Sequence, residues 1–244
     1  MKAWGYTDIG KVRSDNEDAY NVVIDTEKNI GFCIVCDGMG GAAAGNLASK
    51  IAVSTFSEIM GAGLKPGMTE KQLAEIISKA VKAANKSVHD EAARDKKLRG
   101  MGTTLVAAVI SGDNIVIVNV GDSRAYRINR DGISIITRDH SLVEDMLRSG
   151  EITKEQANKH PGKNLITRAI GTDARVHEDI YSLKREDLSF VLLCTDGLTN
   201  LVTEQEILYE IMYGENNSEC CRRLADIANQ RGGYDNITSV LLAL

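Results

Sequence analysis

The order of the predicted strands and helices is the feature that most constrains how this chain can fold. Apolar runs predict strands at residues 2–7, 19–24, 30–36, 103–110, 115–120, 123–128, 133–137, 179–183, 190–195 and 237–244. Helical spacing and capping boxes predict helices at residues 43–60, from Thr69 onward, after Thr203 and at 218–230. Because strands follow one another and helices come in pairs, we expect an α+β fold in which helical hairpins cover antiparallel sheets.

Composition indicates one globular domain that spans residues 1–244. The 244 residues include only two prolines, and no Ser/Gly/Pro-rich linker divides them. Hydrophobic residues make up 43% and charged residues 26%, which is ordinary for a chain with a full core. Residues 141–164 are polar with weak helical periodicity, so we expect a surface insertion there.

Net charge and apolar runs limit the partners and the location. The net charge of -5 gives no basic excess, so we expect no nucleic-acid partner. The first residues lack the apolar core of a signal peptide, and no apolar run reaches membrane-spanning length. We therefore expect a cytoplasmic protein with no membrane partner.

The five cysteines predict buried free thiols. Cys33 and Cys36 match C-x-x-C, but no second pair completes a zinc site. A thioredoxin-like pair would begin a helix, whereas this pair lies inside a predicted strand.

Acidic residues recur where predicted strands begin or end. They are Glu17, Asp18, Asp37, Asp122, Asp196 and Asp235. A carboxylate at the end of a buried strand is costly unless it is paired or binds metal. One such acid could be a cap, but several in one domain favour convergence on hard divalent cations. Oxygen ligands select magnesium, manganese or calcium, and no EF-hand loop is present.

Two other patterns compete with the metal-site interpretation. The pair Asp131-Gly132 lies between two alternating strands and is fully explained by a hairpin turn. The stretch 38–43 fits the dinucleotide fingerprint G-x-G-x-x-A, with Glu58 about twenty residues on. However, Asp37 would face the pyrophosphate, and a second helix follows where a parallel strand is needed.

A nearby cation would suit a phosphate group. Arg13 lies four residues before Glu17, and a guanidinium can hold a phosphate through two hydrogen bonds. The sequence therefore favours phosphate-ester chemistry at a site that holds two Mg or Mn ions.

Eight motifs in order resemble those of the metal-dependent type 2C serine/threonine protein phosphatases, in their bacterial branch. They are RSDNEDAY (13–20), VCDGMGG (35–41), GTT (102–104), VGDSRAY (120–126), DHS (139–141), ITRAIG (166–171), CTDGL (194–198) and DNIT (235–238). The resemblance covers almost the whole chain.

The resemblance implies a four-layer α/β/β/α sandwich with two Mn or Mg ions at one edge and a weaker third. Asp37 would bridge the two ions, with Glu17 and the Gly38 carbonyl on one of them, and Asp196 and Asp235 on the other. It implies further that Asp18 holds water, that Arg13 binds the substrate phosphate, that Asp122 binds the third ion and that 141–164 is a flap. Phosphorylated proteins, among them a serine/threonine protein kinase, would be the partners of a monomeric enzyme.

Some positions depart from the family pattern or have no role in it. Met39 replaces the histidine proposed as general acid in eukaryotic members, and Asn200 replaces an acid of some relatives. His140 and His160 are interpreted as structural, and Arg168 has no assigned role.

Three functions follow for testing. The first is hydrolysis of phosphoserine and phosphothreonine in proteins by a hydroxide that bridges two ions. The second is a non-catalytic scaffold of the same fold that binds phosphoproteins. The third is a two-metal hydrolase of another phosphate ester, such as a nuclease.

Overall fold

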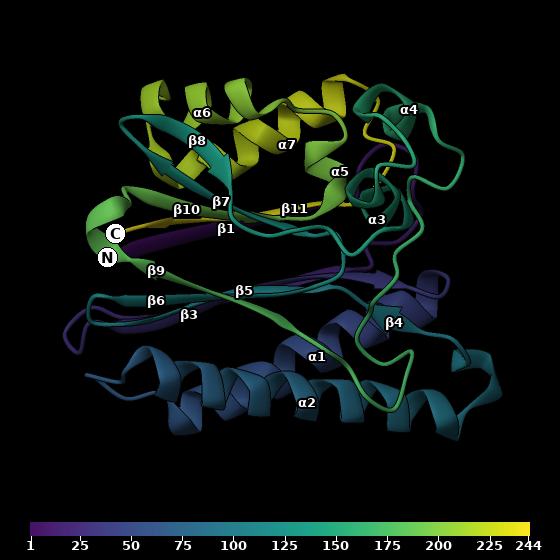
Figure 1. Cartoon of the computed structure of the whole chain (residues 1–244), viewed down its shortest axis with the longest axis horizontal. Helices are drawn as coiled ribbons and strands as arrows, with labels where there is room; N and C mark the ends of the chain where they lie inside the picture. The colour runs from purple at the N-terminus through teal and green to yellow at the C-terminus, as the bar shows by residue number, and fades with distance from the viewer.

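Two antiparallel sheets lie face to face at the centre of the molecule, and a pair of helices covers the outer face of each (Figure 1). The structure, a computed structural model, describes residues 1–41, 43–157, 160–186 and 188–244. The strands are β1 (Lys2–Asp8), β2 (Asp18–Asp25), β3 (Ile30–Met39), β4 (Gly102–Thr103), β5 (Leu105–Ser111), β6 (Asn114–Val120), β7 (Arg124–Asn129), β8 (Gly132–Ile135), β9 (Asp179–Lys184), β10 (Phe190–Cys194) and β11 (Ile237–Ala243). The helices are α1 (Ala42–Gly63), α2 (Glu70–Arg94), α3 (Leu142–Ser149), α4 (Lys154–Lys159), α5 (Asp196–Thr199), α6 (Glu204–Tyr213) and α7 (Cys220–Gln230), with 3₁₀ turns η1 (Lys96–Leu98), η2 (Arg185–Asp187) and η3 (Asn217–Glu219).

The strand order confirms the predicted α/β/β/α sandwich. One sheet runs β1-β11-β10-β7-β8 and the other β2-β3-β5-β6-β9, with every pairing antiparallel. Helices α1 and α2 cover the second sheet, while α6 and α7 cover the first (Figure 1). Three apolar clusters fill the spaces between these four layers. The two termini lie side by side, because Lys2 pairs with Ala243.

Local sequence signals set the helix starts. The Thr69 hydroxyl accepts the Gln72 N–H, and the Gln72 side chain accepts the Thr69 N–H. Thr203 and Glu206 form the same reciprocal cap at α6. These capping boxes satisfy backbone N–H groups that the first helical turn leaves without partners. Both predicted helix starts are therefore confirmed.

The structure corrects two strand boundaries beside the future site. The run predicted as one strand from 103 is divided at Thr104, and β3 continues through Asp37 to Met39. Thr104 leaves the ladder because its Oγ1 accepts the Asp37 N–H (2.9 Å) while its own N–H donates to the Asp37 carbonyl (2.8 Å). Asp37 thus lies inside an extended strand and not after its end.

Other predictions about local structure agree with the fold. The turn at Asp131-Gly132 joins β7 to β8, as predicted. All five cysteines are buried free thiols, also as predicted. None of the helices in the described part of the chain is both long and apolar enough to cross a membrane.

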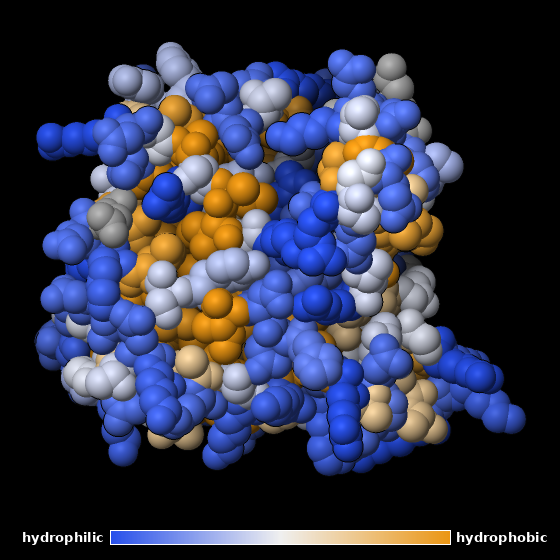
Figure 2. Space-filling model, in the orientation of Figure 1, coloured by the Kyte–Doolittle hydropathy of each residue, from blue (hydrophilic) through white to orange (hydrophobic). Residues whose placement is uncertain are grey.

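Residues 141–164, here called the flap segment, project beside one end of the sandwich. They hold α3 and α4, which Figure 1 shows on the right, on the same side as α5 and the start of β11. A β-bridge between Ser141 and Ile166 joins the first residue of the segment to the chain just after its last residue. Figure 2 shows the largest hydrophobic patch at the left of this face, whereas the side chains right of the centre are mostly hydrophilic, with smaller hydrophobic groups towards the right edge. The end of the sandwich beside the flap segment is therefore the polar end.

Candidate active site

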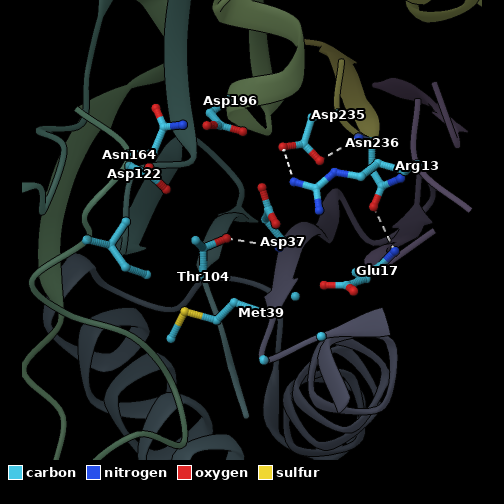
Figure 3. A pocket seen from close by; sticks show the side chains of 14 residues that line it. Arg13, Glu17, Asp37, Met39, Thr104, Asp122, Asn164, Asp196, Asp235 and Asn236 are labelled. Carbon is cyan, nitrogen blue, oxygen red and sulfur yellow. Dashed lines mark hydrogen bonds and ion pairs between the residues drawn. The ribbon is translucent and has the colours of Figure 1, made fainter. Parts of the chain in front are cut away.

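A pocket of about 270 Å³ opens at the polar end of the sandwich. Its lining contains Arg13, Glu17, Asp37, Gly38, Met39, Thr104, Asp122, Asn164, Asp196, Asp235 and Asn236 (Figure 3). Every residue predicted to bind metal or phosphate is among them. Asp18 is not, because it lies buried behind the lining with 6% of its surface exposed.

Asp37 occupies the middle of this arrangement. Figure 3 shows its carboxyl group among those of Asp196, Asp235 and Glu17. The Thr104 and Thr103 hydroxyls hold its backbone N–H and carbonyl, at 2.9 and 2.8 Å. Burial, followed by repulsion from Asp18 and other acids, raises the pKa of Asp37 well above its usual range. The fold therefore places a costly negative charge at a fixed backbone position.

Asp18 lies directly opposite Asp37 in the β2–β3 ladder. Its Oδ2 accepts the Thr195 hydroxyl at 3.0 Å, whereas its buried Oδ1 has no hydrogen-bond partner among the described residues. Burial is the main reason that the pKa of Asp18 rises to about 7, with added repulsion from Asp196 and Asp235. Buried carboxylate oxygens are normally satisfied, so Oδ1 indicates a missing ligand or donor.

Two more acids approach from the other sheet and its loops. Asp196 is the first residue of α5, and Asn200 one turn later donates to its Oδ2 at 3.1 Å. Burial raises the pKa of Asp196, and repulsion from Asp235 adds to this. Asp122 follows Gly121, and burial raises its pKa to about 7. Like Asp37 and Asp18, these groups resist ionisation as long as no cation balances them.

Asn236 holds the Glu17 loop in place, a role that the sequence analysis missed. Its Oδ1 accepts the Glu17 N–H at 2.8 Å, while its Nδ2 donates to the Ile9 and Asp15 carbonyls at 3.0 Å each. Its position in the DNIT motif was the only available signal. The amide joins the start of β2 to the start of β11, which lie more than 200 residues apart.

Two glycines let Glu17 and the end of β3 approach helix α1. A Cβ atom on Gly38 would lie 2.1 Å from the Gly45 carbonyl oxygen and 2.6 Å from that of Glu17. A Cβ on Gly45 would lie 2.3 Å from the Glu17 Oε2 atom. Only glycine permits this contact between backbones.

Replacing Gly38 by alanine is accordingly expected to destabilise the protein by at least about 1–3 kcal/mol, because backbone atoms of two elements must move apart. Urea unfolding of the metal-free protein measures this change. Gly61→Ala is the matched control, since nothing lies within 4 Å of its Cβ position in α1. It should be neutral or slightly stabilising. Equal stabilities for the two variants would contradict the close packing described for Gly38.

Arg13 supplies the positive charge of the pocket. Its Nη2 donates to Asp235 Oδ2 at 2.8 Å, and about half of its side chain is exposed. The hydrogen bond to Asp235, with the nearby charges of Glu17 and Asp37, raises the pKa of Arg13 further. The guanidinium therefore remains charged, and it reaches the rim of the acid-lined space.

The donor set fits hard divalent cations in chemistry. The acids of the pocket offer only oxygen, desolvation in the partly closed pocket raises the pKa values of several of them, and Asp18 Oδ1 has no partner among the described residues. As they stand, no three Asp, Glu, His or Cys side chains of the described residues are gathered closely enough to hold an ion. Arg13 and Asn200 instead hold Asp235 and Asp196. The assignment of individual ligands stays a prediction.

Four other residues that the sequence analysis singled out do not belong to the acidic group. Met39 lines the pocket but offers no proton. His140 and Arg168 lie outside the pocket lining and contact each other and Asp179. His160 accepts the Gly162 N–H within the flap segment. These contacts agree with a structural role for both histidines.

The sandwich and its pocket together define the class of protein. Paired antiparallel sheets carry half-buried carboxylates and one exposed arginine to a common end, which is an arrangement suited to a metal-dependent hydrolase of phosphate esters.

Comparison with known proteins gives the family. The model of protein phosphatase 2C matches residues 11–232. The chain is 39% identical to "serine/threonine phosphatase stp" of Listeria innocua, over 99% of this chain and 95% of that protein. It is 33% identical to "protein phosphatase PhpP" of Streptococcus pneumoniae, over 98% and 95%. The crystal structure of serine/threonine phosphatase Stp1 from Staphylococcus aureus superposes with a TM-score of 0.92 at 34% identity, over 100% and 95%. The chain belongs to the protein phosphatase 2C family.

Proposed function

We propose that this chain hydrolyses phosphoserine and phosphothreonine in proteins with the help of Mn or Mg ions. The observation that carries the proposal is one pocket in which half-buried carboxylates lie close to an exposed arginine. Family membership and the names of the related phosphatases support the reaction class.

The oxygens of six residues would hold the ions. They are the carboxylates of Glu17, Asp37, Asp196 and Asp235 and the Gly38 carbonyl, with Asp122 for a weaker third ion. Bound Mn or Mg supplies a nucleophile from water at neutral pH and offsets the charge of the phosphate.

The remaining groups position substrate and water. Arg13 would bind phosphate oxygens in exchange for part of its contact with Asp235, because a guanidinium suits both acceptors. The unpartnered Oδ1 of Asp18 can accept a hydrogen bond from water. Met39 cannot protonate the departing serine or threonine oxygen, so that proton must come from a different group or from solvent.

The deciding experiment compares substrates with and without metal. With manganese added, phosphoserine and phosphothreonine peptides should be hydrolysed, and a chelator should reduce the rate to background because the metal that would activate water and offset the phosphate charge is removed. Phosphate release is the measurement, and an oligonucleotide is the comparison substrate.

The outcomes separate the competing functions. Binding of phosphopeptide without turnover at any manganese concentration would favour the scaffold function. Faster cleavage of the oligonucleotide would favour a nuclease. Undiminished peptide hydrolysis in excess chelator would contradict the role of metal.

Finer expectations remain predictions. A serine/threonine kinase among the substrates, a monomeric state, a cytoplasmic location and a single domain with residues 141–164 as substrate-selecting flap are proposed from the family resemblance. Dephosphorylation of a purified bacterial kinase would test the first of them.

A further inference from the structure

A buried histidine outside the pocket has its protonation state fixed by its neighbours. His140 is 2% exposed, and its Nδ1 accepts the backbone N–H of Gly121 at 3.1 Å. An amide N–H can only donate, so Nδ1 carries no proton and the neutral ring carries its hydrogen on Nε2. Nε2 lies 3.1 Å from Asp179 Oδ2 and therefore donates to it. The ring thus joins Gly121 to Asp179 by two hydrogen bonds of opposite sense.

His140 holds Gly121 from two sides. Besides the ring contact, the His140 N–H donates to the Gly121 carbonyl at 2.9 Å. Gly121 has a φ of +108°, and a Cβ there would lie 2.6 Å from the Thr104 side chain. This residue immediately precedes Asp122, which lines the pocket. The turn that presents the Asp122 carboxylate is therefore held by the main chain and the ring of one histidine.

The same histidine stands where the flap segment leaves the sandwich. Its carbonyl accepts the Thr167 N–H at 2.8 Å, and the Leu142 N–H donates to the Leu165 carbonyl at 2.9 Å. The outgoing and returning stems of the flap segment thus meet beside His140. A change in the position of His140 would therefore be passed to both stems.

Arg168 completes the junction from the returning stem. Its Nη1 donates to Asp179 Oδ1 at 2.9 Å, while Asp179 Oδ2 receives the His140 ring. Arg168 Nη1 lies 3.4 Å from His140 Nε2, but both nitrogens carry hydrogens and act as donors, so they do not hydrogen-bond to each other. One carboxylate, at the start of β9, therefore links residues on both stems.

We propose that His140, Asp179 and Arg168, here called the His140 tie, fix the position of Asp122 relative to the flap segment. Displacement of the flap segment would therefore also move Asp122 in the pocket. The tie acts through Gly121 and touches no reacting atom, so its members are positioning residues. The consequence for catalysis rests on the proposed phosphatase function, but the mechanical coupling does not.

Two substitutions separate the ring nitrogens. His140→Asn keeps an acceptor oxygen near the Nδ1 position and loses the donor to Asp179. His140→Gln keeps an amide N–H near the Nε2 position and loses the acceptor for Gly121. Loss of one net hydrogen bond corresponds to a change of about tenfold in a local opening equilibrium.

Two measurements report separately on the ring contact with Gly121 and on the ring contact with Asp179, and neither measurement depends on catalysis. Hydrogen exchange at the Gly121 amide should become about tenfold faster in His140→Gln and stay unchanged in His140→Asn. Trypsin cleavage after Arg148, an exposed residue of the flap segment, should become about tenfold faster in His140→Asn and stay unchanged in His140→Gln. Both variants should lower kcat/KM for a phosphoserine peptide about tenfold. Each variant keeps only one of the two ring contacts, to Gly121 or to Asp179, and one contact alone does not connect Asp122 to the flap segment.

His160→Asn is the matched control, because its ring also accepts a backbone N–H, from Gly162 at 3.0 Å. It should leave exchange at Gly121 unchanged.

Should a His140 variant fail to fold, Asp179→Asn serves in its place, since this side chain is about one-third exposed. Asparagine retains an acceptor for the ring but loses the ion pair with Arg168, so only trypsin cleavage should accelerate. Parallel changes in both readouts, or a change in neither, would overturn the tie. If exchange accelerates only in His140→Gln and trypsin cleavage only in His140→Asn, but the peptide is not hydrolysed by the parent protein, the His140 tie is upheld and the phosphatase function is not.

Discussion

Asp37→Asn is expected to lower phosphatase activity by at least about a thousandfold, because the pocket loses the charge at its centre that a metal would balance. Asp37 is flanked by Asp196, Asp235 and Glu17 (Figure 3), and its backbone is fixed by the hydroxyls of Thr103 and Thr104. An amide fills the same space but binds a hard cation weakly. The loss should therefore appear in kcat at saturating manganese, measured as phosphate release from a phosphoserine peptide.

Asp131→Asn is the matched control for Asp37→Asn. It makes the same carboxylate-to-amide change in the turn between β7 and β8, away from the pocket lining. Its activity should equal that of the unmodified protein. The metal-free Asp37→Asn protein should also remain folded, with a thermal midpoint no lower than the parent, because the raised pKa shows that the surroundings of Asp37 disfavour its charged form and an amide cannot ionise. Activity above about one-tenth of the parent would rule out the central role of Asp37.

The metal-free protein is expected to lose stability as the pH rises from about 4 towards 8, and Asp18→Asn should remove much of that loss. The pKa of Asp18 is raised from 3.8 to about 7, mainly by burial. Between these two values the folded state binds more protons than the unfolded state, so raising the pH favours unfolding. Complete ionisation of this one group costs up to roughly 4 kcal/mol.

Comparison of two pH values isolates the ionisation of Asp18 from packing. At pH 5 the buried carboxyl is protonated, so Asp18→Asn should change the free energy of unfolding little or lower it slightly through an imperfectly bonded amide. At pH 8 the variant should be more stable than the parent by about 1–3 kcal/mol. Urea unfolding in the presence of a chelator measures both values, again with Asp131→Asn as control. Parallel pH profiles of the variant and the parent would refute the raised pKa.

These two experiments test different statements about the same acids. The Asp37 experiment asks whether the charge is needed for the reaction, whereas the Asp18 experiment asks what the charge costs the fold. A site built to bind cations should show both, since carboxylates that are costly without a counter-ion are those that a metal stabilises most. This is why binding of manganese should raise the stability of the protein.

Much of the fold could be predicted because its signals are local. Apolar runs and capping boxes at Thr69 and Thr203 marked strands and helix starts, and the structure confirms them. The positions of the acids relative to predicted strands also indicated one shared site, and the pocket contains all of them except Asp18. Short-range backbone preferences and side-chain periodicity depend on neighbours within a few residues, so a sequence displays them directly.

What the tertiary structure alone decided are the contacts between distant segments. The run from 103 divides at Thr104 because that residue bonds to Asp37, 67 positions away. Asn236 reaches the Glu17 loop across 219 positions, and Asp179 gathers His140 and Arg168 from the two stems of the flap segment. Apart from their places in the family motifs, nothing in the local pattern at Thr104, Asn236 or Arg168 distinguishes them from ordinary polar residues. Their partners are chosen by strand register and layer packing, which exist only once the whole chain has folded.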